Sequence, residues 1–428
     1  MNRREFLGGL VATGAMTGRT SGGGDTRTPG GGRIVRDWMS PEVGKPCPTW
    51  TEGELALHFL YFGTGEAMFY QLPDGTTWVN DCGDFVRPHE TKFIPRRPSD
   101  ERLGAEWMAR YIARRTALTH LDYLTVTHWH FDHVGDPALA KRFPSGRIVS
   151  GVAALGESFT FGHYLDFEYP RTNVFGTADV PGLEMTRAFV RRAMAENGMT
   201  AEGFRPGALN QIRLQHDPDG RYAGLFEIRN LAANGVAWTG QAEDSFDGTA
   251  AFLRVARQDK IMQNTLSSSF RLRYGRFSFY CGGDTNGRLA DETCAIIDYE
   301  ARVARLAGPV TVAKTNHHSC RGSMGRETVS ALRAQAYVNN VWCPRQVVDE
   351  TMKNMSSRDL YEGDRFVFNT FLPDEPREKW TVADWWKDVA PAGHVVVKVA
   401  PGGGAYRIYV IRNVDEEDIV TAVYSGVS

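Results

Sequence analysis

The stretch THWHFDH, residues 127–133, decides the fold, because four side chains that can bind a metal fall within six positions: His128, His130, Asp132 and His133. It follows directly on the apolar run LDYLTVT, residues 121–127, and shares Thr127 with it. This run has the length and composition of a buried strand. In extended backbone His128 and His130 point to one side, whereas Asp132 and His133, in the turn that follows, point elsewhere. Imidazoles and a carboxylate suit Zn²⁺, and also Fe or Mn. The stretch therefore predicts a pair of ligands for each of two adjacent metal positions.

The spacing H-x-H-x-D-H after a strand resembles the signature of the metallo-β-lactamase superfamily. Three other stretches resemble its branch of DNA-uptake nuclease-like domains and phosphorylcholine esterases: HFLYFGTGEAMFYQLPDGTTWVNDCGD (58–84), QNTLSSSFRLRYGRFSFYCGGDTN (263–286) and KTNHHS (314–319). In the last, Ser319-Cys320 departs from the Gly-Ser of the branch. The resemblance runs from about residue 55 to 343. It implies an α/β fold, a four-layered αββα sandwich with insertions and a C-terminal extension.

The resemblance also implies roles for single residues. His128 and His130 would hold a first metal, and Asp284 would bridge it to a second. One of the adjacent His317 and His318 would be the last ligand. We expect His318 to be this ligand and His317 to be a catalytic group that faces the substrate, although the reverse order stays open. Lys314 and Asn316 would lie behind the ligands or beside the substrate. The expected metal ligands are His128, His130, Asp132, His133, Asp284 and His318.

The sequence departs from the superfamily at one ligand. A further His usually lies between the first cluster and the bridging Asp, and only His163 and His216 are available here. Their contexts, FTFGHYLDF and LQHDPDG, favour surface or supporting roles over metal binding. Asn264, just before a predicted hairpin, could face the site instead. We therefore expect one or two Zn²⁺ ions, with a first position that has fewer protein ligands and an open place for catalysis.

These residues predict a metal-dependent hydrolase that uses a metal-activated water. Asp132 would orient the nucleophile, and His317 would contact the phosphate or oxyanion or donate a proton. The branch favours a phosphodiester or phosphoester substrate. A lactone, lactam or carboxylic ester hydrolase is the alternative, and a non-catalytic exported metal-binding module is another. Lys and Arg number 49 against 51 Asp and Glu, so net charge does not indicate nucleic-acid binding.

The amino terminus, MNRREFLGGLVA, resembles a twin-arginine export signal, with Arg3 and Arg4 before a short apolar run. That run is too short to span a bilayer, so we expect an exported, periplasmic or extracellular protein without a membrane span in its mature form. Residues 1–30 are the expected signal peptide, and 31–54 a flexible linker rich in Gly at its start. Residues 55–428 form the expected hydrolase domain, with substrate-side insertions at 151–261. The sequence does not predict an oligomeric state.

Periodicity and turn residues predict elements along the chain. Expected strands are 55–62, 66–72, 76–80, 121–127 and 310–313. Expected hairpins are 266–280 and 395–411, and expected helices are 106–112, capped by Ser99, 183–196 and 324–335.

Overall fold

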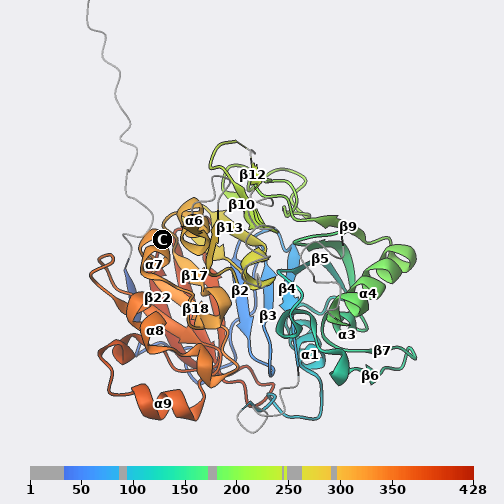
Figure 1. The fold of residues 1–428 in the computed structure, drawn as a ribbon. Helices are drawn as coiled ribbons and strands as arrows, with labels where there is room; N and C mark the ends of the chain where they lie inside the picture. The colour runs from blue at the N-terminus through green and yellow to red at the C-terminus, as the bar shows by residue number, and fades with distance from the viewer. Residues whose placement is uncertain (1–32, 86–93, 172–180, 243–244, 248–262, 291–295) are drawn as a thin grey trace, which may run out of the picture.

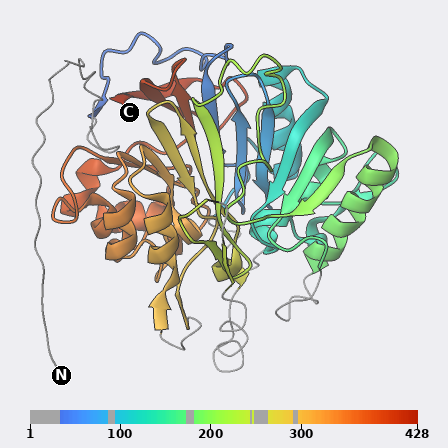
Figure 2. The same cartoon turned by 90° about the horizontal axis from the view of Figure 1, so that it is seen from above.

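The computed structural model describes residues 33–85, 94–171, 181–242, 245–247, 263–290 and 296–428. Two sheets lie face to face, with helices on both outer sides (Figures 1 and 2). These are the four layers of the αββα sandwich that the sequence predicts. In the described part of the chain, no helix is long and apolar enough to cross a membrane. The expected export signal lies outside the described residues.

The first sheet is antiparallel in one half and parallel in the other. Across the sheet from its β1 edge, neighbouring strands pair antiparallel as far as β4. From β4 through β5 and β8 to β9 they pair parallel. Its ten strands, in spatial order, are β1 (Ile34–Arg36), β22 (Val420–Val427), β21 (Ala405–Ile411), β20 (His394–Val399), β2 (Leu55–Leu60), β3 (Ala67–Gln71), β4 (Thr77–Cys82), β5 (His120–Val126), β8 (Thr160–Asp166) and β9 (Thr200–Gly203).

The second sheet repeats this division. Pairing is antiparallel from β12 to β14 and parallel from β14 through β17 and β18 to β19. Its eight strands are β12 (Ser245–Asp247), β11 (Val236–Trp238), β10 (Phe226–Ala233), β13 (Ser269–Tyr274), β14 (Phe277–Cys281), β17 (Val312–Lys314), β18 (Ala336–Asn339) and β19 (Phe366–Asn369). Two short pairs lie apart: β6 (Lys141–Arg142) with β7 (Ile148–Val149), and β15 (Arg288–Ala290) with β16 (Ile296–Asp298).

Aromatic side chains fill the space between the sheets. The ring of Trp78 on β4 lies 4.7 Å from that of Phe270 on β13, and Phe59 on β2 lies 5.7 Å from Phe279 on β14. Sheet and helix layers bury both faces of the central strands, so every residue of β2, β3, β4 and β14 is buried. This explains why their sequences read as apolar runs rather than as alternating patterns.

Helices cover the outer faces. Those on the first sheet are α1 (Gly104–Thr116), α2 (Phe131–Val134), α3 (Gly151–Leu155) and α4 (Pro181–Asn197). Those on the second are α6 (Tyr299–Ala307), α7 (Arg326–Leu332) and α8 (Asp349–Ser356), with α9 (Asp374–Trp380) beyond them. Ser99 does not cap α1. The helix begins after Leu103, whose N–H donates to the Glu106 carboxylate three residues later.

Two segments differ from their expected roles. Part of the expected linker is ordered, because β1 pairs with β22 and the N–H of Cys47 donates to the Asp418 carbonyl. Residues 151–261 supply β8 and β9 to the first sheet and β10, β11 and β12 to the second. The described part of this segment is therefore mainly framework. Its irregular pattern reflects short strands with half-buried residues.

Candidate metal centre

The predicted site residues lie where strands of the two sheets end. His128 follows β5, and Asp132 and His133 lie on the short helix α2 (Phe131–Val134). Asp284 follows β14, and His318 follows β17. Because both sheets present these strand ends at one edge, residues far apart in sequence converge there.

The backbone around the second His pair is unusual. His317, His318 and Ser319, in the turn Asn316–Ser319, all have positive φ, at 46°, 50° and 59°. Non-glycine residues rarely adopt this conformation, and such strain is concentrated at functional sites. The turn buries the His318 ring and leaves the His317 ring half-buried. Two adjacent imidazoles therefore take different positions, with His318 as the inner one.

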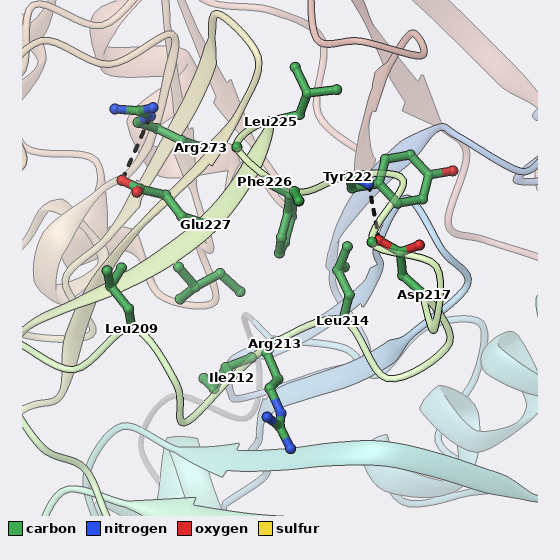
Figure 3. Close-up of a pocket in the computed structure, with 14 residues that line it drawn as sticks. Leu209, Ile212, Arg213, Leu214, Asp217, Tyr222, Leu225, Phe226, Glu227 and Arg273 are labelled. Atoms are coloured by element: carbon green, nitrogen blue, oxygen red, sulfur yellow. Dashed lines mark hydrogen bonds and ion pairs between the residues drawn. The ribbon is translucent and has the colours of Figure 1, made fainter.

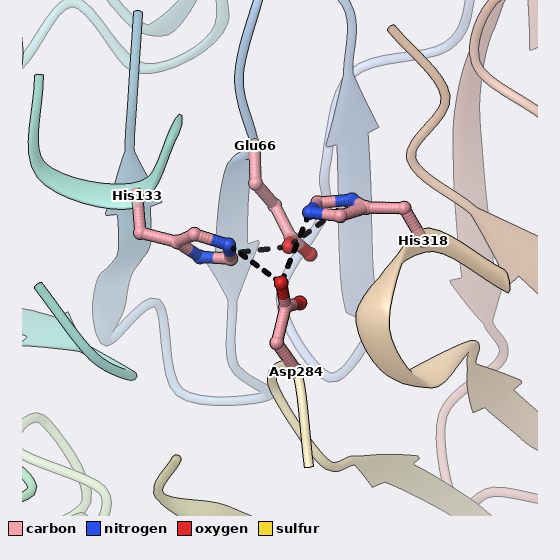
Figure 4. A group of neighbouring side chains, drawn as sticks. All are labelled: Glu66, His133, Asp284 and His318. Atoms are coloured by element: carbon pink, nitrogen blue, oxygen red, sulfur yellow. Dashed lines mark ion pairs between the residues drawn. The ribbon is translucent and has the colours of Figure 1, made fainter. Parts of the chain in front are cut away.

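Four atoms meet at the centre of the cluster. Oδ2 of Asp284 lies 3.3 Å from Nε2 of His133 and 3.3 Å from Nε2 of His318 (Figure 4). Oδ2 of Asp132 lies 3.3 Å from His318 Nε2 and 3.9 Å from His133 Nε2. Metal bonds of about 2.0–2.1 Å at tetrahedral angles separate two ligand atoms by about 3.3 Å. The spacing of these four atoms therefore fits a single metal ion.

His128 and His130 form a second pair beside it. Nε2 of His128 lies 3.1 Å from Nδ1 of His130 and 4.0 Å from Oδ2 of Asp284. The other ring nitrogen of His128 contacts the hydroxyls of Thr127 and Ser267, at 3.2 and 3.3 Å. The two facing nitrogens have the separation of two ligands of one ion. Asp284 lies between this pair and the inner histidines His133 and His318.

Hydrogen bonds fix the tautomers of the inner histidines. Nδ1–H of His133 donates to Asp81 Oδ2 at 2.9 Å, and Nδ1–H of His318 donates to the Asn340 carbonyl at 2.9 Å. Both Nε2 atoms are buried and accept no hydrogen bond from the described residues. A metal-binding imidazole is usually held in this way through its other nitrogen.

Asp81 reaches His133 because β4 is irregular. The β3–β4 register shifts beside Asp81, whose φ is 62°, so the carboxylate turns toward the centre. It also accepts from the Thr127 N–H at 2.8 Å and the Thr127 hydroxyl at 2.7 Å. Asp81 lies within the stretch 58–84 that resembles the superfamily, and the sequence alone assigns it no role.

A buried ion pair, which sequence reasoning did not identify, lies behind the centre. Nζ of Lys314 lies 2.9 Å from Glu66 Oε1 and 3.5 Å from Asp284 Oδ1, and it donates to the Gly283 carbonyl at 2.8 Å. Oε2 of Glu66 lies 3.7 Å from His133 Nδ1 and 3.8 Å from His318 Nδ1. These nitrogens face away from Asp284, so Glu66 belongs to the support rather than to the ligands. Lys314 lies on the same side as Glu66, behind the histidine rings.

Charge is unbalanced in this buried region. Among the described residues, the carboxylates of Glu66, Asp81, Asp132 and Asp284 lie around the two inner histidines, and the ammonium of Lys314 contacts two of them. When no metal cation is bound, protons on the histidines compensate for this excess of negative charge. Burial lowers the pKa of His318, but Asp284 and Asp132 outweigh it and raise that pKa to about 9. Burial likewise opposes protonation of His133, and Asp284 and Asp81 raise its pKa well above the usual value.

Three observations show that this cluster suits a divalent cation: the ligand spacing, the two buried Nε2 atoms and the excess of carboxylates. His133, Asp284 and His318 are members of a buried group whose ligand atoms all lie within 4.8 Å of one another. Zn²⁺, Fe and Mn all accept this mixture of imidazole and carboxylate. The ligand assignments themselves stay predictions.

His317 lies at the rim between two amides. Its Nε2 is 2.8 Å from Asn264 Nδ2, and its Nδ1 is 2.7 Å from Asn286 Nδ2. Burial lowers its pKa, so the ring is neutral at pH 7. With both nitrogens engaged, the ring has no N–H directed at a substrate in this arrangement, and its catalytic role stays a prediction. Asn286 was not identified from the sequence.

The other candidates lie elsewhere. His163 stacks on Tyr123 and bonds to the Thr200 hydroxyl at 2.7 Å. His216 lies 3.1 Å from Asp122, on the half of β5 remote from His128. Asn316 is buried, and its amide donates to Glu300 at 2.9 Å instead of facing a substrate.

Two of the cavities lie against β10. A cavity of about 370 Å³ includes Phe167 and Asn234 in its walls. The Phe167 ring packs 4.7 Å from Trp129, and the Asn234 N–H donates to Leu266 near Asn264. The cavity of about 440 Å³ in Figure 3 includes Phe226 and Arg273, at the ends of β10 and β13 opposite to the metal centre. Neither cavity includes a residue of the metal centre in its walls.

Comparison with protein-family models and with curated proteins gives no match. Among solved structures, a diphosphatase of the PhnP family aligns with a TM-score of 0.32 and 10% sequence identity. The alignment covers 81% of this chain and 97% of that one. At this level the likeness carries no argument about activity, so function has to be argued from the site residues.

Proposed function

We propose that the chain is a metal-dependent hydrolase of the metallo-β-lactamase superfamily that cleaves a phosphodiester or phosphoester. The observation that carries the proposal is the convergence of Asp132, His133, Asp284 and His318 at ligand-to-ligand distances of 3.3–3.9 Å, around two buried imidazole nitrogens. His128 and His130 offer a second position beside it. Zinc, as one or two ions, is the proposed metal.

A divalent ion held there would supply an activated water and would polarise the bond that is cleaved. The protein's contribution is orientation. Asp132 has the most exposed of the centre's carboxylates, with 14% of its side chain accessible, so it can accept a hydrogen bond from the attacking water. Asp284 and His318 are held rigidly by Lys314 and by the Asn340 carbonyl. A centre with one partly accessible carboxylate supports catalysis over a purely structural metal site.

The phosphoester assignment rests on the resemblance in the HHS and GGDTN stretches and on the His317–His318 pair. We also propose export by the twin-arginine route, supported by Arg3-Arg4 before a weakly apolar run. Fusion of residues 1–30 to a reporter that needs export in the folded state would test this.

The activity test compares model substrates on the zinc-loaded full chain. Bis-p-nitrophenyl phosphate and p-nitrophenyl phosphate should be hydrolysed, and His133→Ala should lose metal and at least about a hundredfold in kcat/KM. His163→Ala, outside the centre, is the matched control and should keep both. Turnover of lactones or nitrocefin alone would reassign the substrate class. A zinc-loaded protein inactive on all of them would contradict the proposal and favour a binding module.

A further inference from the structure

The segment Gln263–Leu266 lies along the metal-binding stretch. The Trp129 N–H donates to the Gln263 side chain at 3.3 Å, and the Ser268 N–H donates to the Thr127 carbonyl at 3.0 Å. The Ser267 hydroxyl lies 3.3 Å from Nδ1 of His128. These contacts place Asn264, in the middle of the segment, at the side of the His128–His130 pair.

Asn264 is a buried amide with an unused oxygen. Only 1% of the residue is exposed, and its Oδ1 is buried without a hydrogen-bond partner among the described residues. Its Nδ2 is engaged with His317 Nε2 at 2.8 Å. The amide also lies beside the His130 ring. A buried carbonyl oxygen without a partner is costly, so a ligand for it is expected.

The hydrogen bonds around His317 are consistent with this orientation. If the Asn264 NH₂ donates to Nε2, the neutral ring carries its proton on Nδ1. Asn286 then presents its oxygen to Nδ1–H and its NH₂ to the Thr265 hydroxyl, 3.2 Å away. The oxygen and nitrogen of an amide side chain are assigned from the hydrogen-bond network. A flip of the Asn286 amide therefore exchanges the two atoms and leaves the occupied positions the same. In this arrangement both ring nitrogens of His317 are paired, and the Asn264 oxygen has no partner among the described residues.

The first metal position lacks a third protein group of its own. His128 and His130 supply two nitrogens, Asp284 is shared, and His163 and His216 lie elsewhere. We propose that the amide oxygen of Asn264 is the third ligand of this position, which therefore binds its ion more weakly than the second position does. The inference rests on the proposed metal-dependent function. A neutral carbonyl oxygen is a poorer ligand for Zn²⁺ than an imidazole, whereas the second position has two imidazoles and two carboxylates.

Zinc titration of the chelator-stripped full chain, followed by competition with a chromophoric chelator, tests the inference without an activity measurement. Wild type should bind two equivalents of different affinity. Asn264→Ala should weaken the second, weaker-binding equivalent of zinc, which occupies the His128–His130 position, by about tenfold or more. The first, tighter-binding equivalent should be unchanged. Asn264→His should tighten the second equivalent and shift the absorption spectrum of its Co²⁺ complex.

Asn286→Ala is the matched control, because it removes the other amide from His317 and should leave both affinities as in wild type. Asn264→Asp is nearly isosteric and should tighten the second equivalent, so it replaces Asn264→Ala if that variant does not fold. Unchanged zinc affinities in the folded Ala or Asp variant would overturn the inference while leaving the hydrolase proposal intact. A wild type that binds no zinc would overturn the hydrolase proposal itself.

Discussion

The carboxylate of Asp81 lies 2.9 Å from Nδ1 of His133 and is turned toward it by an irregularity in β4. The same carboxylate accepts two hydrogen bonds from Thr127, the residue before the first predicted ligand. Asp81 thus fixes both the tautomer of one ligand and the start of the metal-binding stretch. It is a positioning residue, because it does not reach the centre itself.

Asp81→Asn should weaken zinc binding by about 10–100-fold, because the amide does not supply the charge that holds Nδ1–H of His133. Competition with a chromophoric chelator measures the change. Asp122→Asn is the control, because Asp122 accepts analogous bonds from Thr77, at 2.8 and 2.9 Å, away from the centre. Equal zinc affinities in wild type and Asp81→Asn would disprove the positioning role.

Lys314→Met should destabilise the metal-free protein by about 3–5 kcal/mol, because it leaves the buried carboxylate of Glu66 without its ion-pair partner. Urea unfolding gives the free energy. Adding Glu66→Gln should recover part of the loss, since the double variant has one buried charge fewer. If the two substitutions were simply additive, the coupling of Glu66 to Lys314 would be refuted.

Zinc uptake should release protons and strengthen as pH rises. In the metal-free protein the pKa of His318 is about 9 and that of His133 is well above its usual value, so both rings are protonated at pH 7. A bound ion must displace these protons, and each displaced proton makes affinity rise about tenfold per pH unit below its pKa. Calorimetry in buffers of different ionisation enthalpy counts the protons. Uptake without proton release would contradict the assignment of these rings as ligands.

Features of the site that depend on local sequence were predictable. The stretch 127–133 and the hairpin turn at Tyr274-Gly275 carry their own signals, a ligand spacing and a turn dipeptide, and the structure has both elements as predicted. The choice of His318 as the inner histidine agrees with its burial, although neither spacing nor composition distinguishes it from His317. These features need few contacts from distant parts of the chain.

Features that depend on distant contacts were not predictable. Glu66 looks like an ordinary residue before a strand, and its role arises only when the second sheet brings Lys314 against it. The Asn340 carbonyl that orients His318 has no side-chain signal at all. The irregular pattern of residues 151–261 predicts insertions, yet the described strands of this region pair into both sheets.

Glu300 supports the loop that carries His317 and His318, and it should make stability depend on pH. Its carboxylate accepts from the Asn316 amide at 2.9 Å and from the Met324 N–H at 2.7 Å, and burial raises its pKa from 4.5 to about 7 despite these bonds. Between these values the folded chain holds a proton that the unfolded chain releases. The stabilisation is therefore complete below pH 4.5 and is lost as pH rises to 7, by up to about 3 kcal/mol. Glu300→Gln mimics the protonated form, so the difference in unfolding free energy between wild type and variant should decline by that amount from pH 4.5 to 7.5 in urea titrations. A difference that stays constant over this range would show that Glu300 is already ionised in the folded protein.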